Sequence, residues 1–207
     1  MSGCRRFVVV CAGAIASDDF SIDDVPGTSG RLDVALRCIR AALLVSHGLR
    51  RDVVVYAVLG GGPRAPRVLR VDAGEARFLR PDERSLAVLA RKVLATRADE
   101  AQPGFVEVRP GIALARGGLD EVVRDVEGAS LFVLERGGTD VRDAADVGAS
   151  DVAFFLGDYV GLPGAARDRL ASLGARPLTV GPVEVHAEDA ITLVLNEIDR
   201  RSAGAPR

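Results

Sequence analysis

The sequence predicts an α/β fold with a mainly parallel sheet flanked by helices. Short runs rich in β-branched residues alternate along the chain with segments whose apolar residues recur at helical spacing. That alternation is typical of parallel strands joined by crossover helices. Hydrophobic residues make up 48% of the 207 residues and charged residues 27%, which is ordinary for a globular protein. We expect residues 1–207 to form one domain with a frayed tail at Ser202–Arg207.

Eight segments are predicted as strands because they are short, apolar and rich in β-branched residues. They are Arg6–Val10, Val53–Leu59, Arg67–Val71, Ala76–Leu79, Phe105–Val108, Leu131–Leu134, Val152–Leu156 and Pro177–Val180. The turn-forming residues Asp72-Ala73-Gly74 separate the third segment from the fourth. These two segments are therefore predicted to pair as a hairpin.

Five helices are predicted from apolar stripes and from their start signals. They cover about Leu32–Ser46, a segment that begins at Pro81, Gly118–Val126, Gly164–Leu173 and Ala187–Arg200. The second helix opens with Pro81-Asp82-Glu83, and both proline and acidic residues favour a first helical turn. In the last helix, Leu193 broadens the apolar face beyond one stripe, which indicates a second packing partner.

The composition excludes several classes of protein. No apolar run approaches the roughly 20 residues that a membrane-spanning helix needs. Residues Met1–Arg6 lead directly into a short strand without the apolar segment of a secretion signal, so we expect a cytoplasmic protein. Cys4, Cys11 and Cys38 contain no CxxC spacing, so we expect neither a disulfide framework nor a metal site.

The charge pattern leaves room for a local basic surface. The net charge of −2 excludes a globally basic nucleic-acid-binding protein. Lys92 is the one lysine among the 27 basic residues, and all the others are arginine. Arginine suits phosphate and stacks on bases, although a codon bias of the genome would produce the same excess.

Two loops after predicted strands suggest a ligand site. Gly157 and Gly161 bracket Asp158 at the end of one strand, and Val180–Ala187 joins the last strand to the last helix. Ligands of open α/β sheets lie beyond the carboxyl ends of strands, and glycine there lets main chain approach a ligand. The alternative for the first loop is an ordinary turn in which Asp158 caps a helix.

The chemistry of the second loop favours adenosine without phosphate. It has no basic or hydroxyl-rich nest for phosphate, so main-chain groups between apolar walls would recognise a flat base. His186 in this loop suits a structural hydrogen bond better than a role as a base. Without further information, an adenosine-binding α/β protein of unknown activity remains an alternative.

Charged residues near the first two helices are candidates for substrate contacts. Arg31 and Asp33 open the first helix and could face a cleft, but Asp33 and Arg37 also have the spacing of a surface ion pair. Further arginines near element starts add positive charge, and solvated surface is the alternative for them. They are Arg50, Arg51, Arg80 and Arg84.

These motifs, taken in order, resemble the archaeal tRNA pseudouridine-54 N1-methyltransferase family, often called TrmY, within the SPOUT superfamily. The resemblance covers almost the whole chain. Its main motifs are Asp18–Gly27, Gly30–Asp33, Arg37-Cys38, Ser46-His47, Arg51–Val53, Pro81–Arg84, Phe155–Gly161, Pro182–Ala187, Ile191-Thr192 and Asn196–Asp199. A single short motif would be weak evidence, whereas several in register are specific.

The resemblance implies a SPOUT fold with a C-terminal trefoil knot that holds S-adenosylmethionine. It also implies a homodimer through the knot and the last helix, and a tRNA partner. Carried over residue by residue, the cofactor contacts are Leu134, Gly157, Val180, Gly181, Pro182, Val183, Glu184, Val185 and Ala190. The family often has a cysteine where this chain has Ala190, and an Asn–His pair where it has Glu188-Asp189.

The implied reaction is methylation of N1 of pseudouridine 54 in the tRNA T-loop. Pseudouridine has an N–H at N1, whereas uridine has no free N1. We expect Asp33 to accept or orient this hydrogen and Arg31 to hold a carbonyl or a phosphate, with Arg37 and Arg84 in support. Arg50, Arg51 and Arg80 are expected phosphate contacts. The alternatives are a SPOUT enzyme for pseudouridine in ribosomal RNA, and a cofactor-binding RNA assembly factor without useful turnover.

Overall fold

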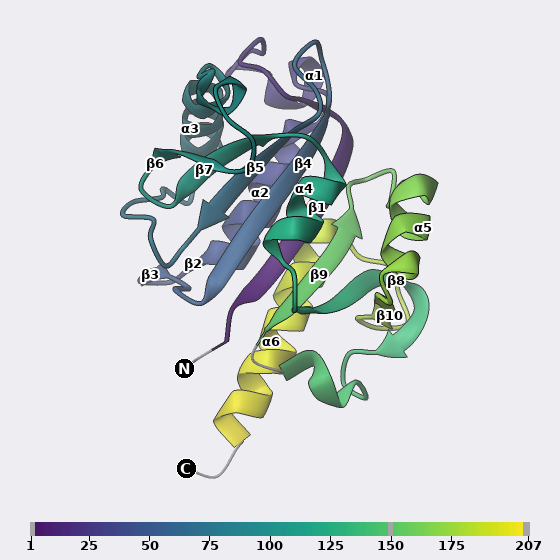
Figure 1. Ribbon diagram of the computed structural model, residues 1–207. Coiled ribbons are helices and arrows are strands. Elements are labelled where there is room, and N and C mark those ends of the chain that lie inside the picture. Colours follow the sequence, from purple (N-terminus) through teal and green to yellow (C-terminus); the bar gives the residue numbers. More distant parts are fainter. Residues whose placement is uncertain (1–2, 149–150, 205–207) are drawn as a thin grey trace.

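The computed structural model describes residues 3–148 and 151–204. An eight-stranded sheet forms the centre of the fold (Figure 1). The strand order is β10-β8-β9-β1-β4-β5-β7-β6. The strands are β1 (Arg5–Ile15), β4 (Val53–Gly61), β5 (Arg67–Asp72), β6 (Val106–Arg109), β7 (Ile112–Arg116), β8 (Ser130–Asp140), β9 (Val152–Gly157) and β10 (Arg176–Thr179). A separate small hairpin consists of β2 (Leu44–Val45) and β3 (Gly48–Leu49).

The sheet has a parallel part and an antiparallel part. Strands β10, β8, β9, β1 and β4 pair in parallel, as predicted for the core of the fold. Strands β5, β7 and β6 extend the sheet in antiparallel fashion beyond β4. Val10 of β1 pairs with Val58 on one side and with Gly157 on the other. The carboxyl ends of β4, β1 and β9 therefore share one edge of the sheet.

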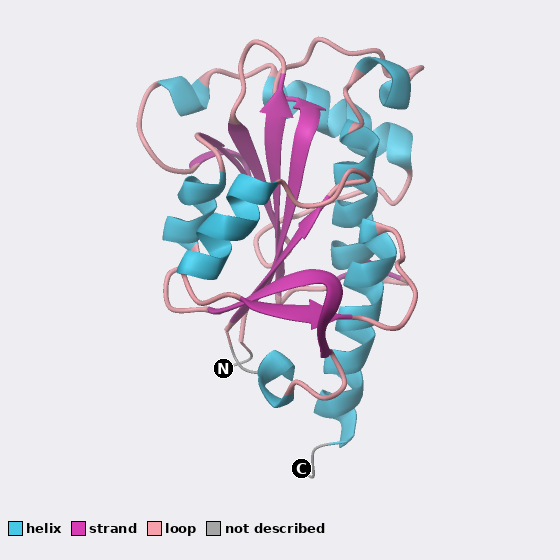
Figure 2. Cartoon of the chain, turned by 90° about the vertical axis from the view of Figure 1, so that its right-hand side faces the viewer, coloured by secondary structure: helices cyan, strands magenta, loops and turns pink. Residues whose placement is uncertain are grey.

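Helices cover both faces of the sheet. They are α1 (Val25–Thr28), α2 (Leu32–Leu43), α3 (Glu83–Leu94), α4 (Leu119–Asp125), α5 (Gly164–Ser172) and α6 (Ala187–Gly204), with 3-10 turns at Ala98–Glu100 and Ala145–Gly148. Residues of α2, α3 and α6 form one apolar core with the sheet, and residues of α4 and α5 form a second one on the opposite face. Figure 2 shows the sheet between these two helical layers. None of the helices in the described residues is long and apolar enough to cross a membrane.

The predicted hairpin after β5 is wrong. Ala76–Leu79 is not a strand, and β5 pairs instead with β4 and with β7, which the sequence analysis did not identify. The Arg51 guanidinium donates hydrogen bonds to the carbonyls of Ala73 and Ala76, at 2.8 and 2.7 Å. The chain between β5 and β6 leaves the sheet, and β7 takes the place predicted for Ala76–Leu79.

The remaining differences concern element ends. Helix α2 ends at Leu43 rather than at Ser46, because the next residues form the β2–β3 hairpin. Strands β1 and β8 are longer than predicted. Helix α6 continues to Gly204, so the part of the predicted frayed tail from Ser202 to Gly204 is helical, and residues 205–207 lie outside the described residues.

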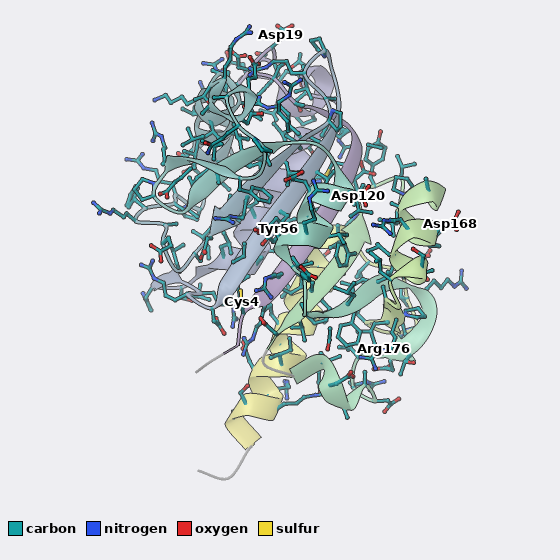
Figure 3. The ribbon with its side chains drawn as sticks, in the orientation of Figure 1. Cys4, Asp19, Tyr56, Asp120, Asp168 and Arg176 are labelled. Carbon is teal, nitrogen blue, oxygen red and sulfur yellow. The ribbon has the colours of Figure 1, made fainter. Side chains whose placement is uncertain are left out.

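Hydrogen bonds from buried polar side chains connect the helical layers to the sheet. Tyr56 lies on the sheet face that α4 covers, and its hydroxyl donates to Asp125 at 2.7 Å (Figure 3). On the opposite face of the sheet, Arg67 of β5 is only 1% exposed. Its guanidinium donates to both carboxylate oxygens of Asp99 and to the carbonyls of Ala16 and Leu94. These hydrogen bonds connect α4, the segment after β1, the end of α3 and the 3-10 turn at Ala98–Glu100 to strands β4 and β5.

The Arg67–Asp99 pair predicts a large loss of stability on neutralisation. Asp99→Asn leaves a buried guanidinium without its counter-charge, so the free energy of unfolding should fall by about 3 kcal/mol. Urea denaturation followed by circular dichroism measures this change. Glu100→Gln is the control, because the Arg64–Glu100 pair is partly exposed and should contribute below about 1 kcal/mol. Equal losses for the two variants would contradict the prediction.

Candidate functional site

A cavity of about 710 Å³ lies at the carboxyl ends of β9 and β10, beside the middle of β8. Its walls come from residues 134–136 within β8, the loop after β9, the loop between β10 and α6, and the first turns of α2 and α6. All nine residues predicted to contact the cofactor line it: Leu134, Gly157, Val180, Gly181, Pro182, Val183, Glu184, Val185 and Ala190. The structure therefore brings together residues from three separate stretches of sequence in one hollow.

The loop after β9 is a tight turn whose shape requires glycine. The main chain of Asp158 bridges to Gly161, and the Asp158 carboxylate accepts a hydrogen bond from the Val160 N–H at 2.9 Å. A Cβ atom on Gly157 would lie 2.0 Å from the carbonyl carbon of Gly161. The loop lines the cavity and is also a side-chain-stabilised turn, but the predicted helix cap is wrong, because Pro163 is the N-cap of α5 and the Asp158 carboxylate binds Val160 instead.

The loop between β10 and α6 presents free main-chain donors. Within the described residues, the N–H groups from Gly181 to His186 donate no hydrogen bond to protein atoms. Nearby apolar side chains provide walls, namely Leu134, Leu156, Leu178, Val183 and Val185. Apolar walls with a few main-chain donors suit a flat, uncharged ring such as adenine. This geometry fits the predicted recognition of adenosine by main chain.

The start of α2 is organised around the carboxylate of Asp33, which is only 1% exposed. It accepts hydrogen bonds from Nε and a terminal nitrogen of Arg31, at 3.0 and 3.2 Å. It accepts a third from Arg37 at 2.6 Å. The predicted ion pair between Asp33 and Arg37 exists, but its acidic member is buried rather than on the surface. Arg31 and Arg37 line the cavity.

The protonation of Asp33 follows from this environment. Burial by itself raises the pKa of the carboxyl group, but the hydrogen bonds from Arg31 and Arg37 outweigh burial and lower the pKa. The carboxylate is therefore ionised at neutral pH and is a weak base. This geometry does not support the expectation that Asp33 accepts the N1 proton. It supports a carboxylate that orients two arginine side chains.

Arg31 is held in a specific conformation at the cavity rim. Its backbone φ is +70°, the one positive φ of a residue other than glycine within the described residues. Such backbone strain in a well-packed position is frequent at functional sites. The guanidinium lies 4.8 Å from the ring centroid of Tyr159, whose side chain is 61% exposed. Arg31 thus projects between a buried anion and an exposed aromatic ring.

The departure from the family pattern at Glu188 has a structural counterpart. The Glu188 carboxylate accepts a hydrogen bond from Nε of Arg37 at 2.8 Å. This ion pair joins the first turn of α6 to α2 and balances the extra negative charge next to the cavity. The Ala190 side chain is buried in the same turn, and its N–H donates to the carbonyl of His186.

The other predicted substrate residues do not line this cavity. Arg50 forms an ion pair with Asp199 of α6 at 2.8 Å, and Arg51 binds the carbonyls that follow β5. Both arginines precede β4, at the opposite edge of the parallel strands from the cavity, and their role as phosphate contacts stays a prediction. Arg80 and Arg84 line a separate hollow beside α3. Within the described residues, no group of three or more His, Cys, Asp or Glu side chains could hold a metal ion.

Comparison with known proteins places the chain in a family. Residues 4–203 match the family model described as "Putative SAM-dependent RNA methyltransferase". The chain is 36% identical to the tRNA (pseudouridine(54)-N(1))-methyltransferase of Methanococcoides burtonii over 97% of its own length and 98% of that protein. It is 37% identical to the enzyme of the same name from Methanosarcina acetivorans, over 96% and 92% of the two chains.

A solved structure supports the fold independently. Archaeoglobus fulgidus Nep1 bound to S-adenosylhomocysteine matches with a TM-score of 0.64, over 98% of this chain and 100% of that one, at 16% identity. The identity is too low for more than a statement about fold, and the shared fold agrees with the predicted mainly parallel sheet flanked by helices. On the strength of the near-complete matches to named relatives, this chain belongs to the tRNA (pseudouridine(54)-N(1))-methyltransferase family of SAM-dependent RNA methyltransferases.

Proposed function

We propose that this protein transfers a methyl group from S-adenosylmethionine to N1 of pseudouridine 54 in tRNA. The observation that carries the proposal is the cavity at the ends of β9 and β10 and the middle of β8, in which predicted cofactor residues lie beside the Asp33-bound arginines. Relatives of this chain that carry the corresponding name cover nearly its whole length. Membership of the family and the geometry of the cavity therefore point to the same reaction.

The cofactor end of the cavity supplies binding and orientation. Main-chain donors between Gly181 and His186 would hold the adenine ring of the cofactor. The turn at Gly157 would lie against the remaining part of the cofactor. S-adenosylmethionine carries its methyl group on a sulfonium sulfur, so the group is already activated for transfer. The protein has to align the acceptor nitrogen with this methyl group and exclude water.

The substrate end of the cavity is built on Arg31. Its guanidinium would donate to a carbonyl of the base, and the exposed ring of Tyr159 beside it offers a surface on which a base can stack. Asp33 acts on the reaction through Arg31 and Arg37, as a positioning residue. Because the target lies in the T-loop, its base must leave the stack before it reaches this cavity.

We also propose that the chain acts in the cytoplasm as one domain and as a homodimer. Exposed apolar side chains around the cavity rim and on α6 favour a second subunit that covers this surface. They are Tyr159, Val160, Val183, Val185 and Leu193.

The pairing of β10 with β8 skips from Val133 to Thr139, so the segment of β8 between these residues arches away from β10. Helix α6 passing through this arch would form the trefoil knot that the family resemblance implies.

The reaction is tested with tRNA that carries pseudouridine at position 54 and isotopically labelled S-adenosylmethionine. Mass spectrometry of the nucleosides should detect N1-methylpseudouridine. The same tRNA with uridine at position 54 should stay unlabelled, because uridine has no free N1. A methyl group found only in ribosomal RNA would favour that substrate, and tight cofactor binding without any product would favour the assembly-factor alternative. Either result would contradict the proposal.

Replacement of Arg31 and Asp33 separates contact from positioning. Arg31→Ala should lower kcat/KM about 100-fold by removing a donor to the substrate. Asp33→Asn should cause a similar loss because both arginine side chains lose their ionic anchor. If Asp33 only positions, the residual kcat of Asp33→Asn keeps the pH profile of the wild type. If the Asp33→Asn variant instead loses the part of the pH–rate profile in which kcat rises as a general base ionises, Asp33 is the proton acceptor.

The homodimer predicts that a charge on α6 separates the subunits. Leu193→Glu should convert a dimer into a monomer in light scattering coupled to size-exclusion chromatography, since it buries a carboxylate in an apolar contact. Val45→Glu is the matched control, because Val45 is comparably exposed but lies in the β2–β3 hairpin. A monomeric wild-type protein, or a Leu193→Glu protein that remains dimeric, would contradict this interface.

A further inference from the structure

A second, strongly basic hollow lies outside the cavity. It has a volume of about 350 Å³ and is bounded by α3 from Arg84 to Lys92, by the segment that precedes α3 and by Arg109 of β6. Four cations line it, namely Arg80, Arg84, Lys92 and Arg109, together with Ser85 and apolar side chains and without any carboxylate. The chain as a whole has a net charge of −2, so this concentration of positive charge is local.

These cations are largely available to an external anion. All four residues are exposed. Among the ion pairs of the described residues, only Arg84 has a carboxylate partner, Asp23, at 2.8 Å. Both side chains of that pair are mostly exposed, at 68% and 82%, so water screens the interaction and a phosphate could replace the carboxylate.

An exposed aromatic ring lies within the same hollow. Phe78 is 74% exposed, although a phenylalanine ring normally loses water contact on folding. The Arg80 guanidinium lies 5.8 Å from the ring centroid. A cationic hollow with an exposed aromatic ring combines the two groups that bind unpaired nucleotides.

The hollow is connected to the catalytic cavity across the surface of α2. A smaller depression of about 210 Å³ lies between α2 and the start of α3, and both helices cover the same face of the sheet (Figure 2). This depression shares Arg37 with the cavity and Leu86 with the basic hollow. Arg40 and Glu83 also line it, so the path from the target site to Phe78 carries charges of both signs.

We propose that this hollow docks an RNA segment adjacent to the target loop, with an unpaired base stacked on Phe78 and backbone phosphates on Arg80, Arg84, Lys92 and Arg109. The inference rests on the proposed function, because it assigns a second contact to the same RNA substrate. An acidic protein would also meet the cations, but it would leave the aromatic ring without a stacking partner. RNA uses both features of the hollow.

The test compares Phe78 variants in tRNA binding. Phe78→Ala should weaken the Kd for full-length tRNA roughly tenfold, a factor within the range for loss of one base–aromatic stack. Phe78→Trp should retain wild-type affinity because it preserves the stacking surface. Leu173→Ala removes an exposed apolar side chain from the opposite side of the sheet and should leave tRNA binding unchanged. Cofactor affinity should be the same in all three variants.

The cations are tested through the salt dependence of binding. Lys92→Gln and Arg109→Gln should each reduce the slope of log Kd against log salt concentration by roughly 0.7 to 0.9, as expected for one lost phosphate contact. Arg116→Gln is the matched control, since Arg116 is exposed at the opposite end of the β6–β7 hairpin from Arg109. Its salt slope should equal that of the wild type.

The outcomes separate this inference from the proposed reaction. Unchanged tRNA affinity in Phe78→Ala, with unchanged salt slopes in the two cation variants, would overturn the RNA-docking inference even if the wild type methylates tRNA. Altered oligomeric state of Phe78→Ala with normal tRNA affinity would also overturn it and assign the hollow to a protein contact. Conversely, Phe78-dependent tRNA binding without methylation by the wild type would support docking and contradict the reaction.

Discussion

The geometry of the catalytic cavity depends on one buried carboxylate, that of Asp33. It binds two guanidinium groups that would otherwise repel each other, and it directs both toward the cavity. Because Asp33 is buried and its pKa is lowered, its charge persists at neutral pH and holds the arrangement before any substrate arrives. Preorganised donors of this kind contribute to catalysis because they need no reorganisation during the reaction.

The same carboxylate connects the cavity to the packing of the helices. Arg37 contacts Asp33 within α2 and Glu188 at the start of α6, so the orientation of one guanidinium couples two helices. Apolar side chains of α6, including Ile191 and Val194, are fully buried against the rest of the core. Displacement of α6 would therefore move the loop from Gly181 to His186 and Arg37 together, so two walls of the cavity are coupled.

The sequence predicted most of the sheet core and the loops that line the cavity, but not the positions of all the arginines. Strand segments such as Val152–Leu156 are apolar on both faces, and the loops that follow them lie at one edge by topology. Isolated arginines carry no such constraint: Arg51 satisfies carbonyls after β5, and Arg50 pairs with α6. Local propensity also could not predict that β7 rather than Ala76–Leu79 pairs with β5, because such pairing depends on distant sequence.

The order of the elements along the chain has a consequence for biosynthesis. Strands β4, β5, β7 and β6 pair mostly with near neighbours in sequence, so this part of the sheet can form while the chain is still being made. The cavity, in contrast, needs α6 and the loop before it, which leave the ribosome after all the strands. A nascent chain therefore has no complete cavity until α6 has been synthesised.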